Sequence, residues 1–233
     1  MKHRLLPFVL LFAVPLISFG QDFTVLESDS HHISIRFELN NFTIDTVRYN
    51  GELMHTITTK GIVAPNEYGS PDLPTFNRFI AIPQGSKAVV EVRNTRAEHM
   101  EQVNIAPAIG SLGEYDEAPP FYKNPTMYDR DALYPTTTIV AAKPQSLRGV
   151  DVIHLGLCPI QFNPIKQEIT VNRQLDIEIR FEGGNGHFGD DRLRSPYWDP
   201  ILQNNILNYS SLETINYQER MQQWLQGMLL LSP

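Results

Sequence analysis

Apolar and polar residues alternate in several stretches of the chain between residues 31 and 182. In residues 32–39 isoleucine, phenylalanine and leucine occupy every second position, and the same period returns in residues 175–182. Successive side chains of a β-strand point to opposite faces, so this period predicts strands that bury one face and expose the other to water. Other strand-like stretches are residues 42–48, 52–59, 78–82, 87–93, 137–142, 150–158 and 168–171.

Turn-forming residues separate the predicted strands. Asn50-Gly51, Gln84-Gly85 and Asn163-Pro164 stand between them, and the chain holds 17 prolines, more than its 14 glycines. Many short strands bounded by turns favour a fold built from antiparallel sheets. We therefore expect a mainly β chain, with a jelly-roll-like antiparallel β-sandwich over residues 21–182.

The first twenty residues have the composition of a secretory signal peptide. Lys2 and Arg4 form a basic start, an apolar run follows, and Gly20 supplies a small residue for cleavage before Gln21. The run is broken by prolines and is too short for a membrane span, which needs about 20 apolar residues. We expect residues 1–20 to be removed and the mature chain to pass through the periplasm and be secreted or held at the cell surface, with no membrane segment.

The composition changes after Phe181, where a run of glycine, asparagine and aspartate begins. Such a change is typical of a domain boundary. We expect residues 183–226 to be a linker with short helices at 200–208 and 211–226. The apolar run at residues 228–231 is expected to be a strand, the first element of a second domain that starts at residue 227.

The chain offers few groups for catalysis or for nucleic-acid binding. Its formal net charge of −7 repels phosphate backbones. Cys158 is its single cysteine, and a strand rise of about 3.3 Å per residue puts His154 about 13 Å away, too far for a catalytic pair. The sequence predicts a buried, inert Cys158, no catalytic residue and no cofactor.

No residue spacing predicts a metal site. Two adjacent histidines, His31 and His32, point to opposite faces of a strand and make a poor metal clamp. Several acidic residues fall near one another in the sequence but lack the spacing of a calcium loop. These are Asp22, Glu27, Asp29, Glu114, Asp116 and Glu117.

Two segments carry a recognisable pattern. Residues 69–74 read GSPDLP and are followed by RFIAIPQG at 78–85, while residues 157–164 read LCPIQFNP and precede the strand at 175–181. Together they resemble gingipain-type propeptides over roughly residues 23–181, and more faintly to residue 233. The resemblance implies a β-sandwich prodomain that assists folding of a secreted cysteine endopeptidase and holds it latent in cis until cleavage.

The resemblance also implies where catalysis would lie. The catalytic histidine and cysteine of that family would lie well beyond residue 233, in a caspase-like α/β domain. The first strand of that domain would be residues 228–231. Cys158 stands inside the propeptide pattern and does not match the catalytic cysteine. The expected partner is therefore the cognate peptidase domain, whose substrate specificity this sequence does not determine.

Two kinds of functional residue follow from the resemblance. Family members with Arg or Lys specificity are kept latent by a basic prodomain residue that enters the specificity pocket. Our candidate for this residue is Lys123, between Phe121 and Pro125. The alternative is that Lys123 is only a solvated loop lysine. For the activating cut the candidates are Arg220, Arg192 and Arg194. A different interpretation, an extracellular module that binds carbohydrate or protein through the aromatic loop 115–134, also predicts a sandwich.

Overall fold

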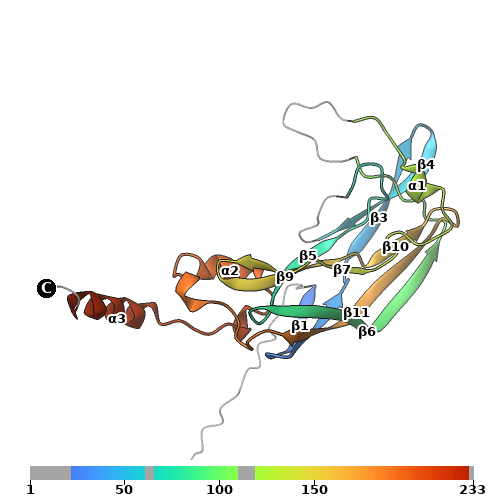
Figure 1. The fold of residues 1–233 in the computed structure, drawn as a ribbon. Coiled ribbons are helices and arrows are strands. Elements are labelled where there is room, and N and C mark those ends of the chain that lie inside the picture. The colour runs from blue at the N-terminus through green and yellow to red at the C-terminus, as the bar shows by residue number, and fades with distance from the viewer. Residues whose placement is uncertain (1–21, 61–65, 110–118, 231–233) are drawn as a thin grey trace, which may run out of the picture.

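The structure is a computed structural model that describes residues 22–60, 66–109 and 119–230. Two antiparallel sheets enclose one core (Figure 1). In the first sheet β1 (Phe23–Ser28), β2 (His32–Glu38), β11 (Glu168–Gly183) and β10 (Ile160–Asn163) follow in order, and β6 (Ser86–Glu101) pairs with the other edge of β11. The second sheet joins β5 (Phe76–Ala81), β9 (Val150–Leu157), β7 (Ile139–Ala141) and β8 (Gln145–Leu147). The predicted mainly β, antiparallel fold is confirmed.

The alternating residues form the core as predicted. In β2 the side chains of Ile33, Ile35 and Phe37 have no exposed surface, and Ile35 lies opposite Ile177 of β11. Side chains on the inner faces of both sheets meet in this core, and the polar residues between them face outward. Burial of these apolar side chains is the main favourable contribution to the stability of the sandwich.

One long strand replaces two predicted ones. β11 runs without a break from Glu168 to Gly183 and pairs along its whole length with β6. The register shifts between Asn172 and Gln174, and a bulge of this kind changes which face the next side chain occupies. The alternation is interrupted at that point in the sequence, although the strand continues.

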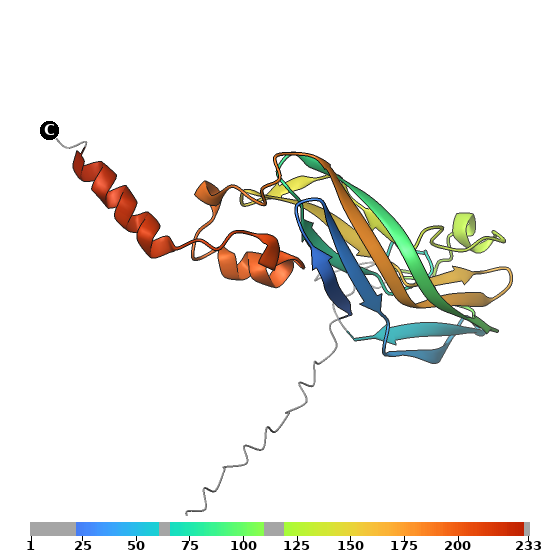
Figure 2. The ribbon, with the colours of Figure 1, turned by 90° about the horizontal axis from the view of Figure 1, so that it is seen from below.

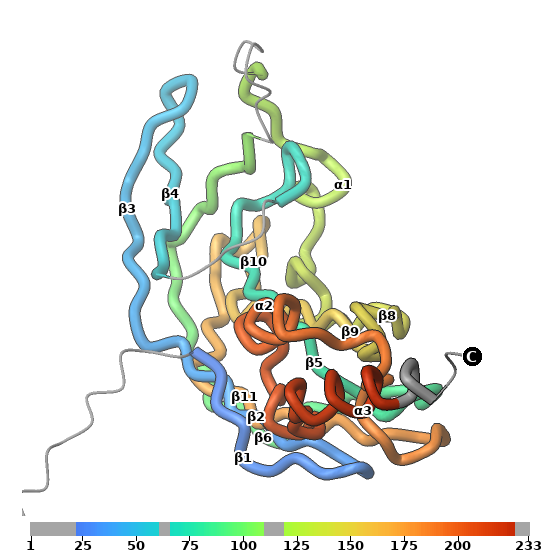
Figure 3. Tube along the Cα trace, turned by 90° about the vertical axis from the view of Figure 1, so that its left-hand side faces the viewer, coloured from blue at the N-terminus to red at the C-terminus, as the bar shows by residue number. Residues whose placement is uncertain are grey.

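A hairpin and a short helix lie at one end of the sandwich. The hairpin joins β3 (Phe42–Tyr49) to β4 (Glu52–Thr59), and α1 (Pro125–Tyr128) follows the long connection after β6. Both project on the same side of the molecule (Figure 3). A backbone bridge between His55 and Ile105 ties the hairpin to the chain after β6.

The segment after β11 packs on the sandwich. It contains η1 (Asp191–Leu193), α2 (Asp199–Asn205), η2 (Tyr209–Ser211) and α3 (Tyr217–Leu230), and α2 and α3 lie at the end opposite the hairpin (Figure 1). Its apolar residues form a second core cluster with Ala81, Val150 and Val152 of the second sheet. These packed residues are Phe188, Leu202, Ile206 and Leu212. We call residues 187–214 the C-terminal module.

The buried side chain of Asn208 joins the C-terminal module to β5. Its amide oxygen accepts from the Ala81 N–H at 2.8 Å and its amide nitrogen donates to the Ala81 carbonyl at 3.0 Å. The Leu207 N–H also donates to the carbonyl of Phe79 at 2.9 Å. The module therefore pairs with backbone groups at the edge of a sheet, which a flexible linker would leave to water.

The predicted strand at residues 228–231 is wrong for the residues that the structure describes. α3 begins at Tyr217, later than the predicted helix, and continues through Gly227 to Leu230. A strand needs a partner for its backbone groups, whereas a helix pairs its own, and leucine, methionine and glutamine favour helices. Within the described residues no helix is long and apolar enough to cross a membrane.

Candidate functional site

Aromatic contacts fix the loop that carries Lys123. Phe121 stacks on Tyr49 of the hairpin, with ring centroids 5.0 Å apart and an interplanar angle of 20°. Tyr122 packs on Tyr68 with centroids 5.5 Å apart, and the Tyr68 hydroxyl donates to the carbonyl of Pro120. We call residues 119–128 the anchored loop, because these contacts hold its first half against the hairpin and the turn at residue 68.

A glycine allows the anchored loop to approach so closely. Gly69 has φ +80°, in the left-handed region, and a Cβ atom there would lie 2.5 Å from the Tyr122 ring. The carbonyl of Gly69 accepts a hydrogen bond from the Asn124 N–H at 2.9 Å. The side chain of Asn124 in turn caps α1 by accepting from the Thr126 N–H. Both ends of the Lys123 segment are therefore held by hydrogen bonds and packing.

Lys123 is paired within the chain. Its Nζ lies 2.7 Å from each carboxylate oxygen of Glu52 and 5.4 Å from the ring centroid of Tyr128. Glu52 also accepts from the side-chain amide of Asn104 at 2.9 Å, and these two bonds, that of Lys123 first, lower the pKa of Glu52. The Lys123 side chain is 26% exposed and Glu52 46%, so the pair lies at the surface.

The structure places the three candidate arginines in different environments. The Arg192 side chain is 87% exposed and forms a bidentate pair with Asp190. Arg194 is 1% exposed in its side chain. The guanidinium of Arg220, in the first turn of α3, donates to the carbonyls of Asp191 and Arg192. Of the three, Arg192 presents the most accessible side chain.

Arg194 is the centre of a buried polar cluster. Its guanidinium binds both carboxylate oxygens of Asp199 at 3.1 and 3.0 Å, the carbonyl of Glu213 at 2.6 Å and the hydroxyl of Tyr209 at 3.1 Å. The hydroxyl of Tyr217 donates to Asp199 at 2.7 Å. Burial acts to raise the pKa of Asp199, but the bonds from Arg194 and Tyr217 outweigh it, so that pKa is lowered. The cluster connects α2, η2 and the start of α3.

Cys158 lies beside the main core, half-buried, with its Sγ 3.2 Å from the carbonyl oxygen of Ile160. Burial raises the pKa of its thiol to about 11, so the thiol stays protonated at neutral pH. His154 packs instead against Phe79, with ring centroids 5.3 Å apart. These surroundings suit the predicted inert role of Cys158.

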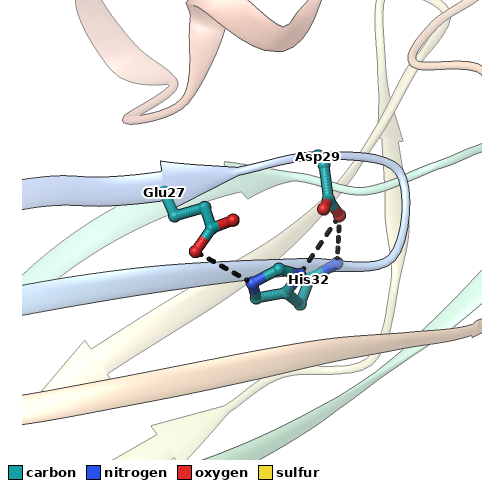
Figure 4. A group of neighbouring side chains, drawn as sticks. All are labelled: Glu27, Asp29 and His32. Carbon is teal, nitrogen blue, oxygen red and sulfur yellow. Dashed lines mark hydrogen bonds and ion pairs between the residues drawn. The ribbon is translucent and has the colours of Figure 1, made fainter.

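Three of the residues that were considered as metal ligands meet at the β1–β2 turn (Figure 4). Asp29 accepts from the backbone N–H groups of His31 and His32 at 2.7 and 2.9 Å and lies 3.2 Å from His32 Nδ1, while Glu27 lies 3.5 Å from His32 Nε2. The backbone bonds to Asp29 lower its pKa and make it a turn residue. Both ring nitrogens of His32 face carboxylate oxygens of this turn.

Some predicted residues lie outside the described part of the chain. These are the signal-cleavage residues Gly20 and Gln21 and the acidic residues Glu114, Asp116 and Glu117. Sequence reasoning also missed residues. Glu52 and Asn208 each bind a group that their local sequence does not reveal, since Glu52 is 71 positions from Lys123 and Asn208 is 127 positions from Ala81. The partner of Asp199, Arg194, is only five positions away.

Comparison with known proteins places the whole fold in a known group. The family model Propeptide_C25 matches residues 19–212, which includes all but the last two residues of the C-terminal module. Lys-gingipain of Porphyromonas gingivalis is 25% identical over 175 residues, 72% of this chain and 10% of that protein. Gingipain R2 of the same organism is 22% identical over 158 residues, 66% of this chain and 21% of that protein. The chain thus spans about a tenth to a fifth of the length of these relatives.

Two solved structures share the fold. One is described as the complex of Porphyromonas gingivalis RgpB pro- and mature domains, with a TM-score of 0.71 and 20% identity, covering 82% of this chain and 98% of that chain. The other concerns zymogenic latency of gingipain K from Porphyromonas gingivalis, with a TM-score of 0.58 and 22% identity, covering 69% of this chain and 92% of that chain. Because the family model covers most of the residues, this chain belongs to the Propeptide_C25 family, the propeptides of gingipain-type peptidases.

Proposed function

We propose that this chain acts in cis on a gingipain-like cysteine peptidase domain, assists the folding of that domain and keeps it latent until the two are cut apart. The observation that carries this proposal is the family match over residues 19–212. The likeness in fold to a prodomain solved with its mature domain supports it. Catalysis would belong to the peptidase domain, and this chain contributes binding surfaces.

The anchored loop supplies a means of inhibition. We propose Lys123 as the residue that enters the specificity pocket of a peptidase with Lys or Arg preference. Its pair with Glu52 lies at the surface, where an ion pair contributes about 0.2–1 kcal/mol, so an acidic pocket can replace Glu52 at small cost. The packed aromatic residues hold the loop before binding, which reduces the entropy lost when the complex forms.

Two substitutions separate this role from a purely structural one. If Lys123 enters the pocket, Lys123→Ala weakens inhibition of the cognate peptidase by at least tenfold, whereas Glu52→Gln leaves it unchanged or strengthens it, because the lysine is released from its internal partner. If the pair only holds the loop in place, both substitutions weaken inhibition to a similar degree. Inhibition constants for the two variants and the wild-type chain decide between these outcomes.

We propose that activation begins with a cut after Arg192. Its side chain is exposed, while Arg194 is buried and Arg220 is engaged by backbone carbonyls in a helix. A protease needs an accessible, locally extended segment. Arg192 lies in η1, and only this three-residue helical turn has to unwind to present an extended segment. N-terminal sequencing of the matured peptidase is expected to begin at Leu193. A start at Ser195 or Met221 would assign the cut to Arg194 or Arg220 instead.

The proposed setting is outside the cell. The basic and apolar composition of residues 1–20 supports export, and the sequence before Gln21 supports removal of that segment. Secretion or attachment at the cell surface, after passage through the periplasm, would then bring the precursor to its place of activation. Mass spectrometry of the exported chain is expected to show Gln21 as its first residue.

The alternative of a carbohydrate-binding module is not favoured. Such modules present flat aromatic faces to a sugar, whereas Phe121 and Tyr122 stack on Tyr49 and Tyr68 of this same chain. The aromatic residues described in the anchored loop therefore support the loop itself. The comparisons point the same way, since both solved relatives are gingipain structures.

A further inference from the structure

Helix α3 leaves the body of the protein at a fixed point. The Tyr217 hydroxyl binds Asp199 at 2.7 Å, and Arg220 donates to the carbonyls of Asp191 and Arg192. These contacts all lie in the first turn of the helix. Beyond that turn α3 points away from both sheets (Figures 1 and 2). The base of the helix is therefore held by the C-terminal module, and the rest projects.

The projecting part of α3 carries an apolar stripe that this chain leaves exposed. Met221, Trp224 and Leu225 are 58%, 61% and 49% exposed. Their spacing of i, i+3 and i+4 places them on one side of the helix. Trp198, by contrast, is covered by the guanidinium of Arg148, 3.9 Å from its ring centroid. We call Met221, Trp224 and Leu225 the α3 stripe.

We propose that the α3 stripe is a docking surface for the peptidase domain, an inference that rests on the proposed function. The anchored loop and α3 lie at opposite ends of the sandwich (Figure 1). Contact through the α3 stripe as well as through the anchored loop would therefore let the prodomain hold the peptidase domain at two separate points. The solved relative in which this fold accompanies a mature domain supports the choice of occupant.

The composition of α3 indicates the kind of surface that it would meet. Tryptophan is among the residues that contribute most to binding in protein interfaces. Two uncharged glutamines, Gln218 and Gln222, flank the stripe, whereas Gln223 and Gln226 fall on the opposite side of the helix. The partner surface is therefore an apolar groove with a hydrogen-bonding rim. The stripe itself carries no charge, and the neighbouring Arg220 is engaged by the carbonyls of Asp191 and Arg192. Docking of the stripe is therefore expected to depend little on ionic strength.

The test measures binding of the chain to the cognate peptidase domain, with the catalytic cysteine of that domain replaced by alanine to prevent digestion. The variant Met221→Gln/Trp224→Gln/Leu225→Gln replaces exposed side chains by a good helix former, so the fold is retained. The dissociation constant is expected to rise at least tenfold. In the wild-type chain the fluorescence of Trp224 should shift to shorter wavelength on binding. The matched control is Gln223→Ala/Gln226→Ala, two exposed glutamines on the opposite side of the helix, expected to stay within threefold of wild type.

Three results would overturn the inference. If the triple variant binds within threefold of wild type, the stripe is not a docking surface. If the wild-type chain is a dimer that the triple variant dissociates, with peptidase binding unchanged, a second copy covers the stripe. If the wild-type chain does not bind the peptidase domain at all, the proposed function itself fails. Circular dichroism of each variant checks that α3 is still helical.

Discussion

Replacement of Asp199 by asparagine is expected to loosen the C-terminal module without unfolding the sandwich. The substitution keeps the shape of the side chain and removes the charge that Nε and Nη2 of Arg194 contact. Arg194, 1% exposed, then keeps the amide oxygen of the new asparagine, the carbonyl of Glu213 and the hydroxyl of Tyr209 as acceptors, with the carboxylate of Asp191 3.7 Å away. Removal of one partner from a buried ion pair costs about 3–5 kcal/mol. We take about 3 kcal/mol here, because asparagine still accepts one hydrogen bond.

The assay is hydrogen exchange at the amides that join the module to β5. The Leu207 N–H donates to Phe79 and the Ala81 N–H to Asn208, so both exchange when the module separates from the sheet. A loss of about 3 kcal/mol predicts protection lower by roughly 150-fold. Amides of the main core, such as that of Ile177, are expected to keep their protection.

Two further variants sharpen this prediction. Glu213→Gln makes the same chemical change in the same module, but its carboxylate lies at the surface, 3.9 Å from His187, and protection should change less than threefold. The double variant Arg194→Met/Asp199→Leu removes the whole pair and should recover most of the protection, since a buried pair gains little over apolar residues. The reasoning is refuted if Asp199→Asn lowers protection of Leu207 less than fivefold, or lowers it equally throughout the core.

Three further predictions concern single groups. Cys158→Ala should leave inhibition unchanged, and the Cys158 thiol should react with iodoacetamide far more slowly at pH 7 than a free cysteine, because its pKa is raised to about 11; fast modification of the folded chain would contradict this. Gly69→Ala should displace Tyr122 and weaken inhibition at least tenfold, as inhibition constants would show, whereas an unchanged constant would separate the loop from inhibition. The lower protection of the Leu207 amide in Asp199→Asn should be fully developed above about pH 4, and the difference from wild type should shrink as the pH falls through the lowered pKa of Asp199; a difference that stays the same below pH 3 would contradict it.

Alternation of side chains was enough to predict the sandwich but not its details. It marked β2, β3, β4 and β9 closely, although only β2 shows a strict alternation of buried and partly exposed residues and β9 buries residues of both faces. It divided β11 in two at Arg173, where a bulge changes the register. It missed β1 because that strand alternates poorly: apolar Leu26 follows apolar Val25 directly and is exposed.

Composition alone does not reveal how the C-terminal module packs. Glycine and aspartate after Phe181 suggested a flexible segment, yet Phe188 and Leu202 reach a second core on the outer side of the β5–β9 sheet. Asn208 contributes through two bonds to the backbone of Ala81, a contact that depends on the fold and leaves no local pattern. The candidate site has the same limit. Lys123 could be selected from its loop, but its partner Glu52 could not.

The most direct test of the account is the effect of this chain on its cognate peptidase. The peptidase domain is produced separately, refolded with and without the chain, and assayed on a small peptide substrate. The account predicts a higher yield of folded peptidase when the chain is present, inhibition that saturates at one chain per peptidase, and recovery of activity once a protease separates residues after Arg192. A peptidase that folds equally well alone and keeps full activity beside a molar excess of the chain would contradict it.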